Sequence, residues 1–522
     1  MPNPPDEAHE WIDRRQLLGA FLVTSGAAAI GGGCASENPP PPLPPTPEKL
    51  PDNLNEDHFI IHNPKPLALE ARRALMGAGL LTPVSRFFVR NNLPRPSDAI
   101  VENAAQWTLA VAGVAKPGAL TLGALRAMPS ETVTMVLQCS GNGRAFFEHG
   151  PSGSPWATGA AACVMWTGVR VRDVLARMGG PLAEARFLTS TGGEELPKDV
   201  EPDLVVVERS IPIDKALDDC LLAWELNGAP IPITHGGPLR LIVPGYFGCN
   251  HIKYVRQIAA TTEESKAKIQ ATGYRFRPIG QKGSTDQPSM WRMPVKSWFN
   301  GPGESARPLW SGEHTFHGVA FSGNRGVVSV EVSWDGEHWE PAALSKAQLG
   351  ANAWRTFQVT KRLTEGSYTI YARATDTAGD TQPEERRENE RGYGHNGWRD
   401  HGLTFEVSKE EQPIASSHET ASKHDAAPST QAAREVTLSD AGSRGKEVFL
   451  HESQPSCGTC HSLQEAGAAG GVGPSLDTLQ PNADQVVKAV KEGVGVMPSM
   501  ESSLSDAQIA DVATYVVEAT RR

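Results

Sequence analysis

The chain has 522 residues, of which 39% are hydrophobic and 21% are charged, so most of it is globular rather than disordered. At this length roughly three or four domains are expected. The formal net charge of −11 argues against a general nucleic-acid binder, which needs a basic face. It suits a soluble protein, whose acidic surface could meet a basic partner.

The first 36 residues are predicted to be an export signal rather than part of the fold. Arg14 and Arg15 stand side by side, and an apolar stretch rich in Gly and Ala covers residues 17–30. This stretch is short for a membrane span, which needs about 20 apolar residues. The arginine pair therefore predicts twin-arginine export to the periplasm, with an uncleaved anchor as the alternative. Cys34 is a candidate for lipid attachment, which would tether the protein to a membrane.

Two domains of different texture are expected after a Pro-rich, extended spacer at residues 37–53. Residues 54–284 alternate apolar strands such as "TVTMVLQC" with helical stretches such as "GVRVRDVLARMG", which predicts a mixed α+β domain. Residues 285–408 alternate apolar and polar positions in short runs, as in "GVVSVEVSWDG". This pattern predicts an antiparallel, immunoglobulin-like β-sandwich.

A small all-α unit is expected at the C-terminal end. Residues 409–436 are polar and lack periodicity, which indicates a flexible linker. Residues 437–522 are helical, and Ser505 is placed to cap the last helix. The expected fold is therefore multidomain: an α+β domain, a β-sandwich and a helical domain.

The helical unit carries the motif "CGTCH", Cys457 to His461. Two cysteines at this spacing can form thioethers with haem, and the adjacent histidine can bind the iron. A zinc site would need two further ligands, and a thioredoxin-like site would not need the histidine. Met497 in "GVGVMPSM" is the expected second axial ligand, with Met500 as the alternative. The unit resembles a monohaem cytochrome c and is expected to carry one covalent haem c.

The α+β domain contains the segment "VLQCSGNGR", in which an apolar strand ends at Cys139 and a glycine-rich turn leads to Arg144. A lone buried cysteine is usually packing material. A thiolate is also a soft ligand for a thiophilic metal, and arginines suit an oxyanion. The segment by itself leaves both readings open.

Several motifs together decide between these readings. The segments "FFVRNNLPRP", "VLQCSGNGR", "SIPIDKAL", "LLAWELNGAPIPITHGGPLRLIVPG" and "ENERG" follow one another in this order. Residues 55–408 thereby resemble the sulfite oxidase family of molybdenum enzymes. The resemblance implies an α+β molybdopterin domain, a dimerisation domain and a molybdenum–molybdopterin cofactor.

The resemblance also implies roles for particular residues. Cys139 matches the molybdenum ligand. Four residues match the substrate pocket of the family: Arg90, Arg144, Trp156 and Arg391. Three match the groups that hold the pterin and its phosphate: His235, Arg240 and Lys253. Chemistry agrees with these residue types, although Arg240 alone would more often form a salt bridge and His235 would by default be a loop histidine.

Two positions depart from the family pattern. Asn92, a candidate cofactor-binding residue, stands where the family usually has a histidine. Trp224, a candidate catalytic residue, stands where we expect a tyrosine that positions substrate. An indole N–H can donate a hydrogen bond but cannot accept one. These departures put sulfite itself in doubt.

The function predicted from the sequence is a periplasmic, molybdenum-dependent sulfite dehydrogenase. Electrons would leave through its own haem to an external cytochrome c or terminal oxidase, and the chain would form a homodimer. One alternative is a sulfane dehydrogenase, or oxidation of another sulfur oxyanion, on the same fold. A second is an electron carrier with a structural, non-enzymatic body.

Overall fold

The computed structural model describes residues 54–77, 79–197, 200–301, 309–409, 438–453, 456–469, 475–493, 497 and 499–521. The chain divides into two compact units, residues 1–44 and 45–522, and every described residue belongs to the second. The predicted export signal, Cys34, the spacer and all but the first residue of the predicted linker lie outside the described residues. Within the described part of the chain, no helix is long and apolar enough to cross a membrane.

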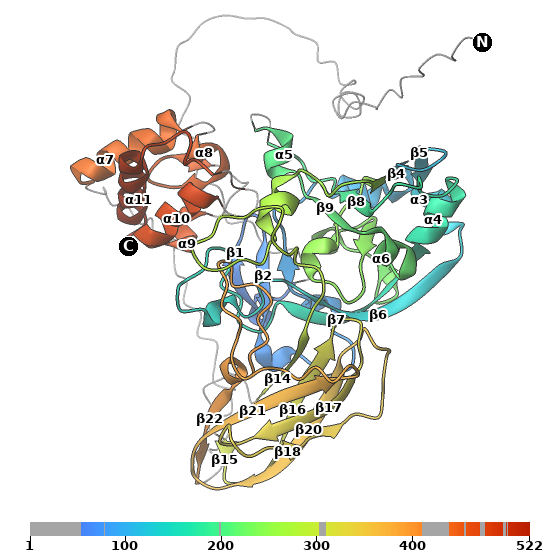
Figure 1. The fold of residues 1–522 in the computed structure, drawn as a ribbon. Helices are drawn as coiled ribbons and strands as arrows, with labels where there is room; N and C mark the ends of the chain where they lie inside the picture. Colours follow the sequence, from blue (N-terminus) through green and yellow to red (C-terminus); the bar gives the residue numbers. More distant parts are fainter. Residues whose placement is uncertain are drawn as a thin grey trace, which may run out of the picture. The chain divides into compact units, whose positions relative to one another are not determined.

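The body begins with a three-stranded antiparallel sheet (Figure 1). Its strands, in spatial order, are β1 (Phe59–Asn63), β2 (Ala68–Ala71) and β3 (Val89–Arg90). Glu70 on β2 is buried, and its carboxylate accepts hydrogen bonds from the amides of Ala157 and Gly159 at 3.0 and 2.8 Å. A buried carboxylate needs such donors. They anchor the loop that follows Trp156.

A second sheet delivers the Cys139 turn. Its order is β11-β10-β7-β6, with β12 also paired to β10. Val136 and Leu137 on β6 belong to two different hydrophobic clusters, so both faces of the strand are covered. This burial explains the unbroken apolar run before Cys139. The bounds are β6 (Ser130–Gln138), β7 (Ala161–Arg170), β10 (Leu221–Leu226), β11 (Ala229–Pro230) and β12 (Arg240–Ile242).

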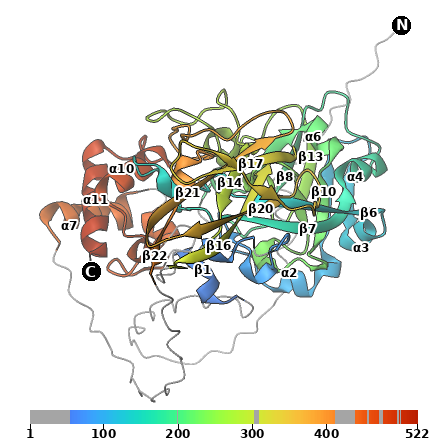
Figure 2. The same ribbon diagram turned by 90° about the horizontal axis from the view of Figure 1, so that it is seen from below.

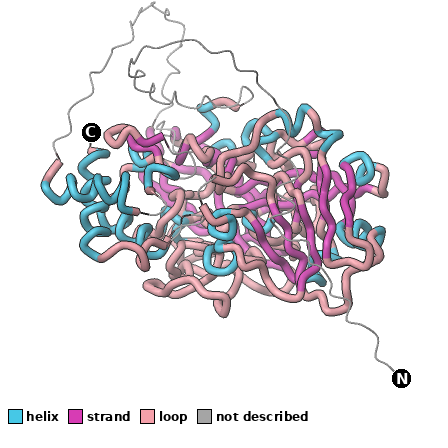
Figure 3. Tube along the Cα trace, turned by 90° about the horizontal axis from the view of Figure 1, so that it is seen from above, coloured by secondary structure: helices cyan, strands magenta, loops and turns pink. Residues whose placement is uncertain are grey.

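A third sheet has the order β5-β4-β13-β8-β9, in which only the β13–β4 pair is parallel. Figure 3 shows the strands of the body lying side by side, with short helices at its margin. The strands are β4 (Thr108–Ala112), β5 (Gly118–Thr121), β8 (Phe187–Thr191), β9 (Glu208–Pro212) and β13 (Gln257–Thr261). The helices are α2 (Ala99–Glu102), α3 (Leu122–Arg126), α4 (Val171–Arg177), α5 (Pro202–Val205) and α6 (Ile213–Asp218). The predicted mixed α+β class is confirmed.

The next domain is a sandwich of two sheets, with the orders β14-β16-β20-β19 and β15-β22-β21-β17-β18 (Figure 2). On β21 the alternate residues Ile370, Ala372 and Ala374 face a shared hydrophobic core, as the period-two pattern predicts. The strands are β14 (Val295–Phe299), β15 (Leu309–Trp310), β16 (Gly312–Ser322), β17 (Val327–Ser333), β18 (Glu340–Pro341), β19 (Ala343–Leu344), β20 (Arg355–Leu363), β21 (Gly366–Asp376) and β22 (Leu403–Ser408). The long segment between β21 and β22, residues 377–402, supplies Arg391.

The C-terminal domain is helical, as predicted. Ser505 caps the last helix, since its hydroxyl accepts a hydrogen bond from the amide of Gln508 at 3.3 Å. A Cβ added to Gly445 would lie 2.0 Å from the carbonyl oxygen of Asp511, so a glycine lets α7 and α11 cross closely. The elements are α7 (Asp440–Glu447), α8 (Cys457–Cys460), β23 (Ser462–Leu463), β24 (Ala468–Ala469), α9 (Leu476–Leu479), α10 (Ala483–Glu492) and α11 (Asp506–Thr520).

Candidate active site

The thiol of Cys139 lies just beyond the end of β6. Its amide donates to the carbonyl of Ala160 at 2.9 Å, and its carbonyl accepts from the amide of Asn142 at 3.0 Å, which closes the turn. Gly143 has φ +104°, and a Cβ there would lie 2.4 Å from the ring of His395. Only glycine fits this position. The turn therefore holds a buried thiol at the edge of two cavities that both include Cys139 in their walls.

The two cavities bring most of the predicted residues together. The smaller encloses about 60 Å³ and the larger about 250 Å³. Arg90, Asn92, Cys139 and Tyr274 line both of them. The smaller is also lined by His235, Arg240 and Lys253, and the larger by Arg144, Trp156 and Arg391. The predicted cofactor set and the predicted substrate set therefore lie on the two sides of Cys139.

Arg144 projects into the larger cavity from the 3₁₀ turn Arg144–Phe146. Its Nε donates to the carbonyl of Arg391 at 3.0 Å, and its Nη1 donates to the carbonyl of Ser154 at 2.7 Å. Burial lowers the pKa of this guanidinium. No carboxylate among the described residues pairs with it within 4.0 Å. Its charge is therefore available to an anion in the cavity.

Arg90, Asn92 and Tyr274 form a connected group on the wall that the two cavities share. The side-chain oxygen of Asn92 accepts from Nη2 of Arg90 at 3.0 Å and from the hydroxyl of Tyr274 at 3.4 Å. Burial raises the pKa of the Tyr274 hydroxyl, so it stays protonated at neutral pH. Asn92 thus orients one cation and one hydroxyl donor beside Cys139.

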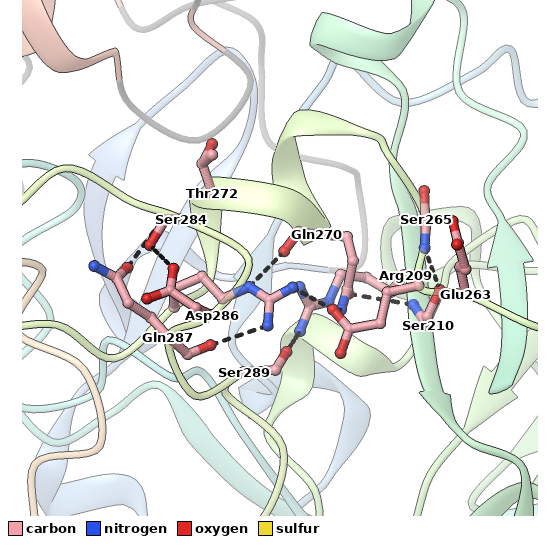
Figure 4. Close-up of polar contacts among 12 residues, drawn as sticks. Arg209, Ser210, Glu263, Ser265, Gln270, Thr272, Ser284, Asp286, Gln287 and Ser289 are labelled. Atoms are coloured by element: carbon pink, nitrogen blue, oxygen red, sulfur yellow. Dashed lines mark hydrogen bonds and ion pairs between the residues drawn. The ribbon is translucent and has the colours of Figure 1, made fainter. Parts of the chain in front are cut away.

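A polar network that includes Arg209, Gln270 and Ser289 (Figure 4) holds the segment that carries Tyr274. Tyr274 follows the π-helical turn Ile269–Gly273. Nη1 of Arg209 donates to the carbonyl of Ile269 at 3.0 Å, and its guanidinium carbon lies 5.5 Å from the centre of the Tyr274 ring. Arg275 donates through Nε to the carbonyl of Gln270 at 2.9 Å. These contacts fix the backbone on both sides of the tyrosine.

A second tyrosine, Tyr393, comes from the sandwich domain. The Tyr393 ring stacks on the Tyr274 ring with 5.4 Å between the ring centres. The guanidinium carbon of Arg144 lies 5.4 Å from the centre of the Tyr393 ring. Trp156 is fully buried in the wall of the larger cavity, and its indole N–H has no partner among the described residues. Arg391 completes this wall. The larger cavity thus combines cations with aromatic rings, which suits a small anion.

The smaller cavity is a basic cradle. Nζ of Lys253 donates to the side-chain oxygen of Asn91 at 2.7 Å and to the carbonyl of Thr234 at 2.6 Å, and Arg240 donates to the carbonyl of His235 at 2.7 Å. Burial lowers the pKa of Lys253 well below its usual value, and the neighbouring Arg240 lowers it further. Burial also lowers the pKa of Arg240 to about 10. Such a cluster gains stability from a bound anion.

Unsatisfied atoms in this cradle fit a polar cofactor. Nε2 of His235, Nε of Arg240 and Nδ2 of Asn91 are buried without hydrogen-bond partners among the described residues. Buried polar atoms are normally satisfied. A molybdopterin phosphate would meet the two cations, and the pterin ring atoms would meet the imidazole and amide. The residues present therefore fit the group that the sequence resemblance implies.

Trp224 corrects one expectation. It lies on β10 in the main hydrophobic cluster and lines neither cavity. Leu222 and Trp224 share this cluster, whereas Leu221 and Ala223, on the other face of the strand, belong to a second cluster. The pocket hydroxyl expected at this position is supplied by Tyr274. Trp224 therefore gives no information about which substrate the cavity binds.

The helical domain brings its haem-binding residues together. Cys457 and Cys460 lie on α8 and His461 follows it, and all three line the larger cavity with Met497 and Met500. Apolar residues form the rest of this part of the wall: Phe449, Leu476, Val486, Val490, Val512 and Val516. An apolar cavity with two thiols, an imidazole and a thioether fits a covalent haem. Both methionines face the cavity, so Met497 as axial ligand stays a prediction.

Comparison with known proteins finds family matches to three successive segments of the chain. Models of three families match: an oxidoreductase molybdopterin binding domain at residues 95–269, a Mo-co oxidoreductase dimerisation domain at 287–404, and cytochrome C oxidase, cbb3-type, subunit III at 440–516. The fold and the site thus define a molybdopterin-dependent oxidoreductase with its own c-type cytochrome.

Similarity to individual proteins identifies the family within this class. Sulfite oxidase of Gallus gallus is 35% identical over 347 residues, which cover 62% of this chain and 72% of that protein. Mitochondrial sulfite oxidase of Mus musculus is 32% identical over 353 residues, or 64% of this chain. The match spans only 63% of the mouse protein's length. The chain belongs to the sulfite oxidase family, and its cofactors are molybdenum–molybdopterin and haem c.

A solved structure is also similar. The sulfane dehydrogenase SoxCD from Paracoccus pantotrophus matches with a TM-score of 0.54 and 26% sequence identity. The match covers 66% of this chain and 87% of that one.

Two pocket residues were missed in the sequence. Tyr274 lies in an irregular stretch rich in Gly, Pro and Lys, and Tyr393 lies two residues beyond the predicted Arg391. Tyr393 could have been found only by its closeness in sequence to Arg391, which was a predicted site residue. Nothing in the sequence around Tyr274 indicates that its hydroxyl would reach Asn92.

Proposed function

We propose that this protein is a sulfite dehydrogenase, which converts sulfite and water into sulfate, two protons and two electrons. The observation that carries the proposal is the convergence of Arg90, Arg144 and Arg391 on one cavity beside Cys139. Three guanidinium groups lining one cavity beside the thiol suit a compact oxyanion. The molybdenum cofactor supplies oxygen transfer and the two-electron redox change, and the haem carries single electrons.

The chain's own residues bind the anion and manage its protons. Cys139 would hold the metal, and His235, Arg240 and Lys253 would hold the pterin and its phosphate. The guanidinium groups of Arg144 and Arg391 would orient the sulfite oxygens. The protonated hydroxyl of Tyr274 would donate a hydrogen bond to the substrate. Trp156 and Tyr393 would exclude water from one side of the cavity, which strengthens these contacts.

A second candidate is sulfane dehydrogenase activity on the same site. The match to SoxCD favours it, because that structure is described as a sulfane dehydrogenase. A sulfane sulfur would occupy the same arginine-lined cavity. We prefer sulfite because Arg90, Arg144 and Arg391 line the cavity, and three guanidinium groups suit a compact oxyanion. A third reading, an electron carrier with a structural body, predicts protein without molybdenum even from a host that makes the cofactor.

The N-terminal sequence and the dimerisation domain also bear on location and partners. The paired arginines near the N-terminus support twin-arginine export to the periplasm, and Cys34 is the candidate for a lipid tether. The matched dimerisation domain supports a homodimer. An external cytochrome c or terminal oxidase would accept the electrons.

An anaerobic mixing experiment tests the proposed function. Sulfite added to metal-replete protein should reduce the haem, as seen in its absorbance. The Cys139→Ser variant should lose this reaction while dithionite still reduces its haem. Turnover by that variant, or an oxidised haem in the wild type after sulfite is added, would contradict the proposal. Elemental analysis of the same samples reports the molybdenum content.

A further inference from the structure

Residues 389–393 serve two sites at once. The side chain of Asn389 clamps the backbone of Tyr393, because it accepts from its amide at 2.8 Å and donates to its carbonyl at 2.9 Å. Arg391 and Tyr393 line the substrate cavity. Glu390 and Arg391 also contact the C-terminal half of α10 in the haem domain. One short segment thus joins the substrate cavity to the haem domain.

The strongest contact across this boundary is an ion pair between Glu390 and Lys488. Glu390 has no solvent-exposed surface, and 26% of the Lys488 side chain is exposed. The second carboxylate oxygen of Glu390 accepts from the amide of Gly280 at 2.7 Å. Lys488 is the ion-pair partner of Glu390 among the described residues. A buried carboxylate that loses such a partner keeps an uncompensated charge, so removing one member of the pair is costly.

The surrounding charges agree with a docked state. Nη1 of Arg391 donates to the carbonyl of Gly493 at 3.4 Å, where the end of α10 carries partial negative charge. Glu492 lies one turn after Lys488 on the same face of α10. Burial raises the pKa of Glu492, and the nearby Glu390 raises it further. Lys488 and the carbonyl end of α10 thus face groups of opposite charge, whereas Glu492 and Glu390 repel each other across the boundary.

A second ion pair crosses the same boundary in a different environment. Lys282 of the body pairs with Glu501 of the haem domain, and their side chains are 66% and 42% exposed. Exposed pairs contribute little to stability, because water and salt screen them. This pair is therefore a matched control: it joins the same domains, but its loss is expected to matter little.

We propose that the Glu390–Lys488 pair fastens the haem domain to the segment that carries Arg391 and Tyr393, and that this docked state is the one that transfers electrons to the haem. The haem cysteines and Cys139 line one continuous cavity in this arrangement. Docking also positions Arg391, which lines the substrate cavity and donates a hydrogen bond to Gly493 of the haem domain. The electron-transfer role rests on the proposed function, whereas the docked contact does not.

Rapid mixing with sulfite under anaerobic conditions tests the electron-transfer role. Lys488→Met should slow haem reduction at least tenfold, with the molybdenum content and haem spectrum unchanged. Glu390→Gln, which keeps an acceptor for the Gly280 amide, should slow it similarly. The double variant should be no slower than either single variant, because both remove one interaction. Lys282→Met should stay within twofold of the wild type.

A rate for Lys488→Met within twofold of the wild type, or equal to that of Lys282→Met, would overturn the proposal. Carbodiimide cross-linking tests docking without sulfite. A Lys282–Glu501 cross-link, identified by mass spectrometry, should form in the resting protein and fall at least fivefold in Lys488→Met. An unchanged or absent cross-link would refute the docked contact. A wild-type haem that sulfite fails to reduce would refute the function but leave this second result decisive.

Discussion

Replacing Arg144 by methionine would test the anion site most directly. The guanidinium is buried, and its two hydrogen bonds go to the carbonyls of Arg391 and Ser154 rather than to a carboxylate. Methionine keeps an unbranched apolar stem but removes the charge. A hydrogen bond to a charged group contributes about 1.5–3 kcal/mol. Since 1.4 kcal/mol corresponds to about tenfold, kcat/KM for sulfite should fall about 10- to 150-fold.

The assay is steady-state reduction of added cytochrome c at varied sulfite. Arg144→Lys should recover only part of the loss, because an ammonium keeps the charge without the planar fork. Arg399→Met is a suitable control, since that side chain is 51% exposed and pairs with Glu384 outside the cavity. A kcat/KM for Arg144→Met within threefold of the wild type, at equal molybdenum content, would refute the role assigned to Arg144.

Four further predictions follow from the same geometry. Tyr274→Phe should lower kcat about 100-fold, by roughly the same factor at pH 7 and pH 9, because burial raises the pKa of the hydroxyl and keeps it protonated; stopped-flow pH profiles check this. Trp224→Tyr should leave KM and kcat within threefold of the wild-type values, because the Trp224 side chain packs in the core. A larger kinetic loss would show that residue 224 acts in the pocket. Met497→Leu should lower the haem reduction potential in spectroelectrochemistry, whereas Met500→Leu should not, because a thioether ligand raises the potential. Lys296→Met should stabilise the protein more at pH 6 than at pH 10, as measured by urea unfolding. Burial lowers the pKa of this lysine to about 7 in the folded protein, whereas the pKa in the unfolded chain is about 10.4. The free-energy cost of burying the charge is therefore full below pH 7 and disappears as the pH rises through about 10.4.

The order of motifs along the chain was enough to predict the domain classes. The apolar run before Cys139 predicted a buried strand, and the structure places β6 there with both faces covered. The period-two alternation predicted β21 and its partners in the sandwich. Local periodicity reports which faces are buried, so it is readable without the fold.

The sequence did not predict the direction of side chains whose orientation depends on long-range packing. Trp224 was expected in the pocket, but it lies with Leu222 in the main hydrophobic cluster on one face of β10. No sequence pattern indicated the role of Tyr274. Its hydroxyl donates to Asn92, and its backbone is positioned by contacts with Arg209, which lies 65 positions earlier in the sequence. Neither direction follows from local pattern.

By itself, the amino-acid sequence determined the haem attachment motif, the candidate thiolate Cys139 and the family of the body, because these depend on residue types at short spacing. Tertiary structure alone decided which hydroxyl faces the substrate cavity and which charges meet across the haem domain. The Glu390–Lys488 pair joins residues 98 positions apart in sequence, and its strength depends on burial. Burial is a property of the folded chain, so it becomes visible only when distant segments are packed together.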